Sequence, residues 1–181
     1  MKKIHIARIL FVIFILLNVY SLLPAVSFYF KKPILPIRLN RDIARGLAGN
    51  KEPYFSFIVT SDTGSGLFPN NSATLKLVSR INREDRFHKT PIDFVVNVGD
   101  VTFRGKEAHY KDYAKIKEMI KFPVIDAIGN HDDDFDQGLG GMVLFKKYCG
   151  VTNFSFMDRN SYFIVLDDKD GDFNESQFAW L

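Results

Sequence analysis

The alternation of three short apolar segments with amphipathic segments is the feature that most constrains the fold. Residues 54–61, 93–99 and 123–129 are rich in β-branched and aromatic side chains and have the length of strands. Between them, residues 72–85 and 106–122 carry apolar side chains on one face and charged ones on the other, which predicts helices. A strand–helix–strand–helix–strand order predicts an α/β fold with a parallel sheet whose strands are covered on both faces.

The remainder of the chain continues with a helix, a strand pair and a last helix. Residues 141–150 predict a short helix, and residues 153–157 and 162–167 predict two strands joined by a tight turn. The sequence predicts Asn174 as the cap of the last helix, with Gln177 at the position that reaches back to it.

Polar side chains follow each of the three early strands. Asp62 follows the first, Asp100 the second, and Asn130, His131 and Asp132 the third. Ligand sites in parallel sheets form just beyond the carboxyl ends of the strands, which meet at one edge. The sequence therefore predicts that these side chains share a site.

Carboxylate and amide oxygens suit hard divalent ions. Asp100 could bridge two metals, with Asp62 on one ion and Asn130 on the other. Two such ions would lower the pKa of a bound water and clamp a phosphoryl group, and His131 could protonate the leaving oxygen.

Two motifs at this spacing resemble those of the calcineurin-like metallophosphoesterase family, part of the metallo-dependent phosphatase superfamily. They are GDVTFRG at residues 99–105 and GNHD at residues 129–132, and the segment ending in SQFAWL is also similar. The resemblance covers residues 54–181. It implies a calcineurin-like phosphoesterase sandwich, of which this chain carries the first part, and hydrolysis of a phosphomonoester or phosphodiester by metal-activated water.

The resemblance also implies a role for each matching residue. Asp62 would bind the first metal, Asp100 would bridge both, and Asn130 would bind the second. His131 would contact the scissile phosphate, Asn130 would also bind the substrate, and Asp132 would orient His131. The implied cofactors are two divalent ions, whether Mn, Fe, Zn or Mg.

Three departures from the family pattern support a different interpretation. Gly64 stands where the family most often has a histidine, and Phe103 stands where purple acid phosphatases have a tyrosine ligand. The family's later histidines would follow Leu181, so we expect a domain that is incomplete at its C-terminus. The alternative function is a non-catalytic or truncated pseudoenzyme fragment that binds metal weakly.

Asp62-Thr63-Gly64 also spells the triplet of aspartic proteases. Those enzymes need two such aspartates that share a proton, and their lobes are all-β. This chain has no second triplet, which disfavours that chemistry. Because Cys149 is the one cysteine of the chain, an intrachain disulfide is excluded. We expect Cys149 to be a buried small residue near a helix end.

The N-terminal region predicts a membrane anchor. Residues 9–30 carry no charge and are long enough to cross a bilayer, and basic residues flank them. We interpret residues 1–30 as a cytoplasmic flank with an uncleaved transmembrane signal anchor, although a signal peptide cleaved after Ser27 also fits. Residues 31–53 then form a basic juxtamembrane linker.

The predicted topology is a single-pass membrane protein with the phosphoesterase domain, residues 54–181, on the extracytoplasmic side. The basic excess lies beside the membrane, where anionic headgroups attract it. The domain itself is mildly acidic, so we expect a phosphate-ester substrate and no nucleic-acid-binding surface.

Overall fold

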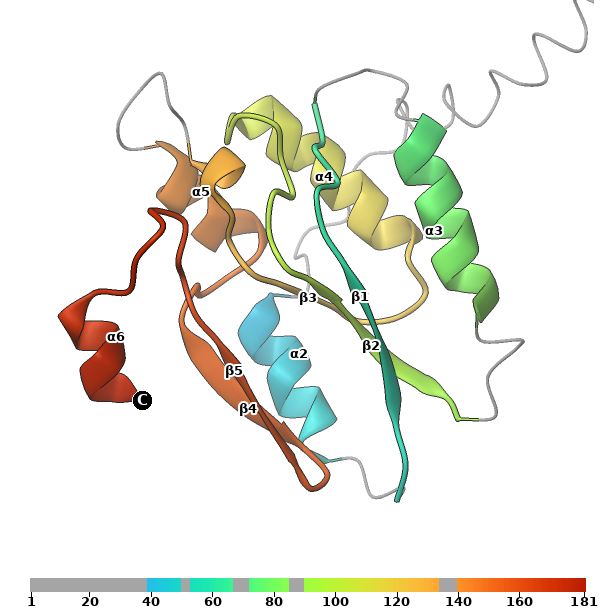
Figure 1. Cartoon of the computed structure of the whole chain (residues 1–181). Coiled ribbons are helices and arrows are strands. Elements are labelled where there is room, and N and C mark those ends of the chain that lie inside the picture. Colours follow the sequence, from blue (N-terminus) through green and yellow to red (C-terminus); the bar gives the residue numbers. More distant parts are fainter. Residues whose placement is uncertain (1–38, 50–52, 67–71, 85–89, 134–139) are drawn as a thin grey trace, which may run out of the picture. The chain divides into compact units, whose positions relative to one another are not determined.

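A parallel sheet of three strands forms in the computed structural model, as the alternation predicts (Figure 1). Its strands are β1 (Ser56–Thr60), β2 (Ile92–Asn97) and β3 (Val124–Asp126), in the order β1-β2-β3. Both neighbouring pairs are parallel, so all three carboxyl ends lie at one edge. The predicted α/β class is confirmed.

The structure describes residues 39–49, 53–66, 72–84, 90–133 and 140–181. The predicted anchor at residues 9–30 lies outside these ranges. Within them, none of the helices combines the length and the apolar character that crossing a bilayer requires.

Three helices pack on one side of the sheet: α3 (Ser72–Glu84), α4 (Glu107–Met119) and α5 (Gly140–Tyr148). Ile81 of α3 packs with Val95 and Val124 of the sheet. Tyr110, Tyr113 and Ala114 of α4 pack with Phe145, Tyr148 and Cys149 at the α5 end. Cys149 is fully buried, as the sequence predicts. These contacts bury the apolar face that each helix presents.

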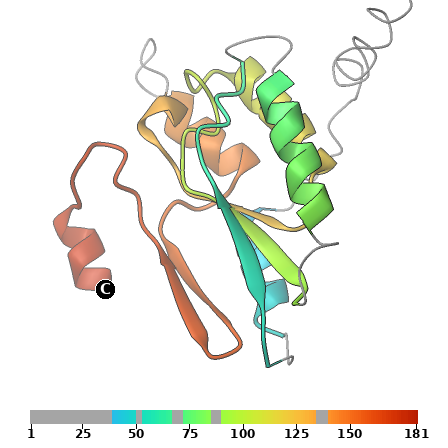
Figure 2. The ribbon, with the colours of Figure 1, turned by 45° about the vertical axis from the view of Figure 1, so that its right-hand side comes forward.

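The other face is covered by α2 (Asn40–Leu47) and an antiparallel hairpin of β4 (Phe154–Asp158) and β5 (Ser161–Val165). Figure 2 shows the hairpin and α3 on opposite sides of the sheet. Phe94, Phe156 and Phe163 pack ring against ring in this layer, with Phe94 and Phe163 edge to face at 5.5 Å between centroids. The aromatic contacts join the hairpin to the sheet.

Helix α2 belongs to the folded unit, although the sequence assigns it to the 31–53 linker. Ile43, Ala44 and Leu47 are buried against the sheet and the hairpin. A domain that began at residue 54 would leave these side chains out of the core. The structure therefore extends the folded unit to Leu39 at least. Burial of one amphipathic face, rather than helix propensity, accounts for this helix.

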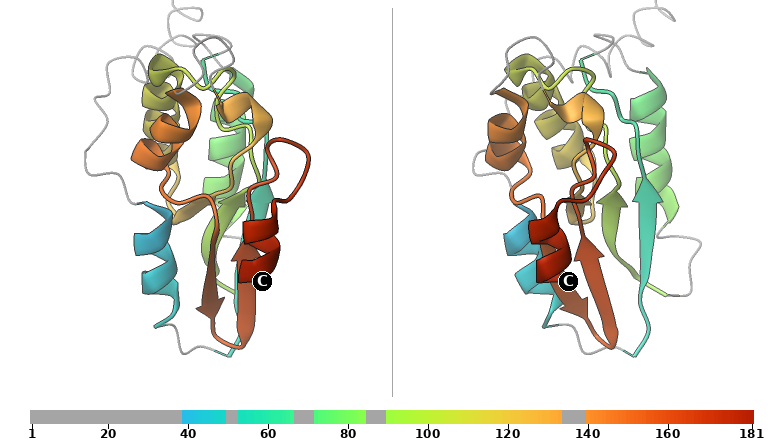
Figure 3. Two further views of the ribbon diagram at one scale, coloured as in Figure 1. Left: turned by 90° about the vertical axis from the view of Figure 1, so that its left-hand side faces the viewer. Right: turned by 60° about the vertical axis from the view of Figure 1, so that its left-hand side comes forward.

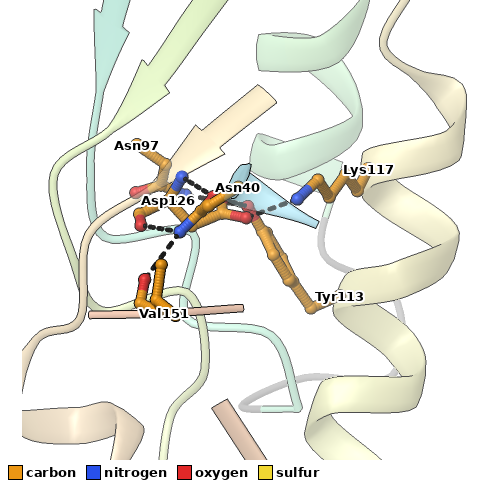
Figure 4. Close-up of polar contacts among 6 residues, drawn as sticks. All are labelled: Asn40, Asn97, Tyr113, Lys117, Asp126 and Val151. Atoms are coloured by element: carbon orange, nitrogen blue, oxygen red, sulfur yellow. Dashed lines mark hydrogen bonds and ion pairs between the residues drawn. The ribbon is translucent and has the colours of Figure 1, made fainter. Parts of the chain in front are cut away.

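A buried polar network fixes the start of α2 (Figure 4). The Asn40 side-chain amide donates to the backbone oxygen of Asp126 at 2.7 Å and to that of Val151 at 3.2 Å. Its carbonyl accepts from the Asp126 backbone N–H at 2.9 Å. Asn40 is fully buried, so these bonds replace the water that the amide loses on folding.

The same network reaches α4 through the Asp126 carboxylate. It accepts from Lys117 Nζ at 2.5 Å and from the Tyr113 hydroxyl. Asn97 of β2 donates to that hydroxyl at 3.4 Å. Because Asp126 is fully buried and Lys117 nearly so, the two charges form a buried ion pair that links β3 to α4.

Coverage of the sheet differs between its strands. β3 is buried throughout, as predicted, and β2 is buried or half-buried. The edge strand β1 departs from the expected burial on both faces, because Phe57 and Val59 are 41% and 58% exposed. No strand in the described ranges pairs with the outer side of β1.

The chain then continues into α6 (Glu175–Trp180), which lies beside the hairpin (Figure 3). The predicted cap is confirmed: the Asn174 side chain accepts from the Gln177 N–H at 3.1 Å, and the Gln177 side chain accepts from the Asn174 N–H at 2.9 Å. Phe178 and Trp180 are exposed on this helix.

Candidate functional site

The turns after β1 and β2 have the same backbone form. Asp62 and Asp100 both have φ of 53°, a left-handed conformation that few residues other than glycine adopt and that aspartate tolerates. Backbone hydrogen bonds between the two chain segments continue beyond the ends of β1 and β2. The Asp62 N–H donates to the Gly99 carbonyl at 3.1 Å, and the Gly64 N–H donates to the Asp100 carbonyl at 3.0 Å. The two aspartates therefore lie on adjacent, aligned turns.

Gly129 allows the turn after β3 to lie against Asp100. A Cβ at this position would overlap the Asp100 carboxylate and its backbone nitrogen. The next turn, η1 (Asn130–Asp132), is fixed by the His131 N–H, which donates to the Asp100 carboxylate at 3.0 Å. The glycine of the GNHD motif is thus needed for the close approach of two backbone segments and not for an unusual φ.

These turns surround a pocket of about 490 Å³ at the carboxyl edge of the sheet. Asp62, Asp100 and Asn130 all line it, together with Gly99 and Gly129. Asp62 and Asn130 are exposed and Asp100 is half-buried, so solvent reaches all three. The structure brings the three predicted ligands together, and this position in a helix-covered parallel sheet differs from an all-β protease lobe.

His131 and Asp132 do not line this pocket. The His131 ring stacks on Phe103 at 6.0 Å between centroids, and its Nδ1 lies 3.1 Å from the Phe103 carbonyl oxygen. Phe103 therefore positions the His131 ring through both its side chain and its carbonyl oxygen. The family-implied roles of His131 and Asp132 stay predictions.

Asp132 joins the turns after β2 and β3. Its fully buried carboxylate accepts backbone N–H bonds from Val101, Thr102 and Gly129 at 3.2, 2.7 and 2.9 Å. It also accepts from the Thr102 hydroxyl at 3.1 Å. Burial raises the pKa of Asp132 to about 6, although these hydrogen bonds oppose the shift.

The loop between β5 and α6 supplies the opposite wall of the pocket. Asp168, Lys169, Asp170 and Gly171 line it, and none of them was a candidate from the sequence. The available signal was a polar, acid-rich segment that directly follows a strand. The sequence alone does not place this segment at the pocket, because the position of β5 relative to the sheet depends on tertiary packing.

The pocket residues fit a divalent cation in kind but not in number. On the strand-end side of the pocket, two carboxylates and one amide offer oxygen ligands of the type that hard ions prefer. In the part of the chain that the structure describes, no cluster of three or more His, Cys, Asp or Glu side chains could hold a metal. The described strand-end donors are therefore of the right chemical type but fall short of a complete set of ligands for two ions.

Comparison with known proteins identifies a family for this chain. The family described as calcineurin-like phosphoesterase matches residues 55–177. Among solved structures, a purple acid phosphatase from yellow lupin (Lupinus luteus) seeds matches at 19% identity with a TM-score of 0.42. The match covers 68% of this chain and 26% of that one, so this chain spans about a quarter of the lupin enzyme. No curated protein matches. From the extent of the family match, the chain belongs to the calcineurin-like phosphoesterase family.

Proposed function

We propose that this chain is a metal-dependent hydrolase of phosphoric esters, with its reaction site in the pocket at the carboxyl edge of the sheet. One observation carries the proposal: three successive strand-end turns bring Asp62, Asp100 and Asn130 to one solvent-accessible pocket in a member of this family. Pockets in this position of parallel sheets are where α/β proteins bind their ligands.

In this proposal, Asp62, Asp100 and Asn130 hold divalent metal, whether Mn, Fe, Zn or Mg. When bound, such ions activate water and offset the negative charge of a phosphoryl group. The family resemblance assigns protonation of the leaving oxygen to His131, which follows the pocket residue Asn130 in the chain although it does not itself line the pocket. Asp132 would hold the two turns that carry Asp100 and Asn130 in register, through the backbone bonds that its carboxylate accepts.

The test is hydrolysis of a generic aryl phosphate by the full chain, with added Mn and with a chelator. We expect turnover that requires Mn and is lost in Asp100→Asn. Asp112→Asn is a matched control, because Asp112 is a carboxylate on α4 that pairs with Lys115 outside the pocket. Turnover that survives both the chelator and Asp100→Asn would refute the proposal.

The second candidate is a non-catalytic member of the family that binds metal weakly. It is favoured by Gly64 and Phe103, which cannot ligate, and by the shortage of ligands among the described residues. Gly64→His separates the two, because histidine tolerates the left-handed conformation at this position better than most residues. A ligand-limited site predicts tighter Mn binding in Gly64→His, and no gain over Gly64→Ala would argue against it.

We also propose that residues 9–30 anchor the protein in a membrane as a single-pass segment, with the domain on the extracytoplasmic side. The support is an uncharged apolar segment flanked by basic residues. The protein should then stay in the membrane fraction after an alkaline carbonate wash. Recovery in the soluble fraction with a new N-terminus near Phe28 would show a cleaved signal peptide instead.

A further inference from the structure

The loop between β5 and α6 is held firmly at the pocket. The Asp167 N–H donates to the Asn153 side chain at 2.8 Å, and the Gln177 side chain donates to the Asp167 carbonyl at 2.7 Å. Within the loop, the Gly171 N–H donates to the Asp168 carbonyl at 2.6 Å. Lys169 is among the residues that line the pocket on this side.

Lys169 is the cationic side chain among the residues that line the pocket, where Asp62, Asp100, Asp168 and Asp170 are acidic. Its side chain is only 13% exposed. Hydrogen bonds to Asp170 and Asp133 raise the pKa of Lys169, so the ammonium is charged at neutral pH. Lys169 therefore places a fixed positive charge in an otherwise acidic pocket.

The contacts of the ammonium leave it able to bind a further anion. Among the described residues, Nζ pairs with Asp133 at 3.1 Å and Asp170 at 2.8 Å. An ammonium has three donors, so one remains. The Asp170 side chain is 80% exposed, and surface ion pairs of this kind contribute little. A ligand oxygen can therefore replace Asp170 while Asp133 keeps the ammonium in place.

We propose that Lys169 is a substrate-binding residue that contacts a terminal oxygen of the phosphate group and selects phosphomonoesters over phosphodiesters. A monoester carries up to two negative charges on three terminal oxygens, whereas a diester carries one charge on two. A cation opposite the strand-end aspartates therefore favours the monoester. This inference rests on the proposed function and deepens it.

The experiment measures binding of inorganic phosphate by calorimetry, with Mn and with chelator, to the full chain and four variants. Lys169→Met should weaken phosphate binding about 10- to 100-fold, the range expected for loss of a charged hydrogen bond. Lys169→Arg should retain most of the binding, and Asp170→Asn should tighten it because a competing carboxylate is removed. Lys147→Met is the matched control, because Lys147 pairs with Glu107 outside the pocket.

Hydrolysis provides a second measurement. Lys169→Met should raise KM for an aryl monoester more than KM for a bis-aryl diester, with Mn affinity unchanged. Phosphate binding that is absent in the wild type, equal in Lys169→Met, or reduced equally in Lys147→Met would overturn the inference. Phosphate binding that depends on Lys169 without any ester hydrolysis would uphold the Lys169 contact and refute the proposed function instead.

Discussion

Two groups of polar side chains flank the carboxyl end of β3, and they differ in what surrounds them. Asp126 ends the strand inside the buried network with Asn40, Tyr113 and Lys117, where its oxygens already accept hydrogen bonds. Asn130 lies four residues later at the open pocket, with Asp62 and Asp100. Similar side-chain chemistry is enclosed in one place and open to solvent in the other.

This difference in burial indicates that the two groups of side chains serve different properties of the protein, namely stability for the buried network and ligand binding for the pocket. A buried charge must have partners, and removal of one partner is costly because the other charge is then left without compensation. Solvent-accessible carboxylates carry no such requirement and keep lone pairs for a ligand. The buried network should therefore govern unfolding, and the pocket should govern metal binding and turnover.

The largest expected effect is on turnover. Asp100→Asn should lower kcat/KM for an aryl phosphate roughly 10³-fold, because the metal stabilises transition-state charge by several kcal/mol. The free energy of unfolding, measured with urea, should change by less than about 1 kcal/mol, because asparagine tolerates the left-handed turn. A large loss of stability with turnover retained would reverse the assignment of the two regions.

The buried network should show the opposite pattern. Lys117→Met leaves Asp126 buried without its cation and should cost about 3–5 kcal/mol of unfolding free energy. Lys111→Met is the control on the same helix, since its pair with Glu107 is about half exposed at 3.6 Å and should cost less than about 1 kcal/mol. Equal urea midpoints for the two variants would contradict the claim that the buried network governs unfolding.

Asp132 lies between the two cases, because it is buried but belongs to the pocket turns. Its pKa is raised from 3.8 to about 6 in the folded protein. Its contribution to stability is therefore fully present below about pH 4 and is lost as pH rises through 6, by about 3 kcal/mol.

A carboxyl-carbon NMR titration of metal-free protein tests this shift directly. The Asp132 resonance should titrate near 6. A midpoint close to the ordinary value of 3.8 would show that the backbone hydrogen bonds outweigh burial.

The smallest effect concerns the glycines of the turns. Gly129→Ala should cost about 1–3 kcal/mol through overlap with Asp100 and should also reduce turnover. Gly64→Ala has space for its Cβ, with the nearest atom at 3.8 Å, and should cost about 1–2 kcal/mol for its left-handed φ alone. Turnover unaffected by Gly129→Ala would show that this close approach does not position Asp100.

The sequence predicts much of this arrangement because local patterns determine it. The strands from β1 to β3 are apolar runs, and each is followed by the polar turn that carries Asp62, Asp100 or Asn130. Alternation implies a parallel sheet, and a parallel sheet implies that these turns share an edge. The Asn174 cap was predictable for the same reason, since its partner Gln177 is three residues away.

The parts that the sequence does not predict depend on contacts between distant segments. Helix α2 is short and forms because Ile43 and Leu47 are buried against Phe94 and Ile125. Lys169 faces the pocket only because the hairpin packs on the sheet. Two of the three backbone partners of Asp132, Val101 and Thr102, lie about thirty residues away, so its residue type alone does not reveal its role.

The most direct test of the account is a titration with Mn followed by electron paramagnetic resonance of the free ion. It compares wild type, Asp100→Asn and the control Asp112→Asn in the full chain. We predict that wild type and Asp112→Asn bind Mn, and that Asp100→Asn binds it at least about 10-fold more weakly, as expected when coordination is disrupted. No binding by wild type, or equal affinity in Asp100→Asn, would contradict the assignment of this pocket as a metal site.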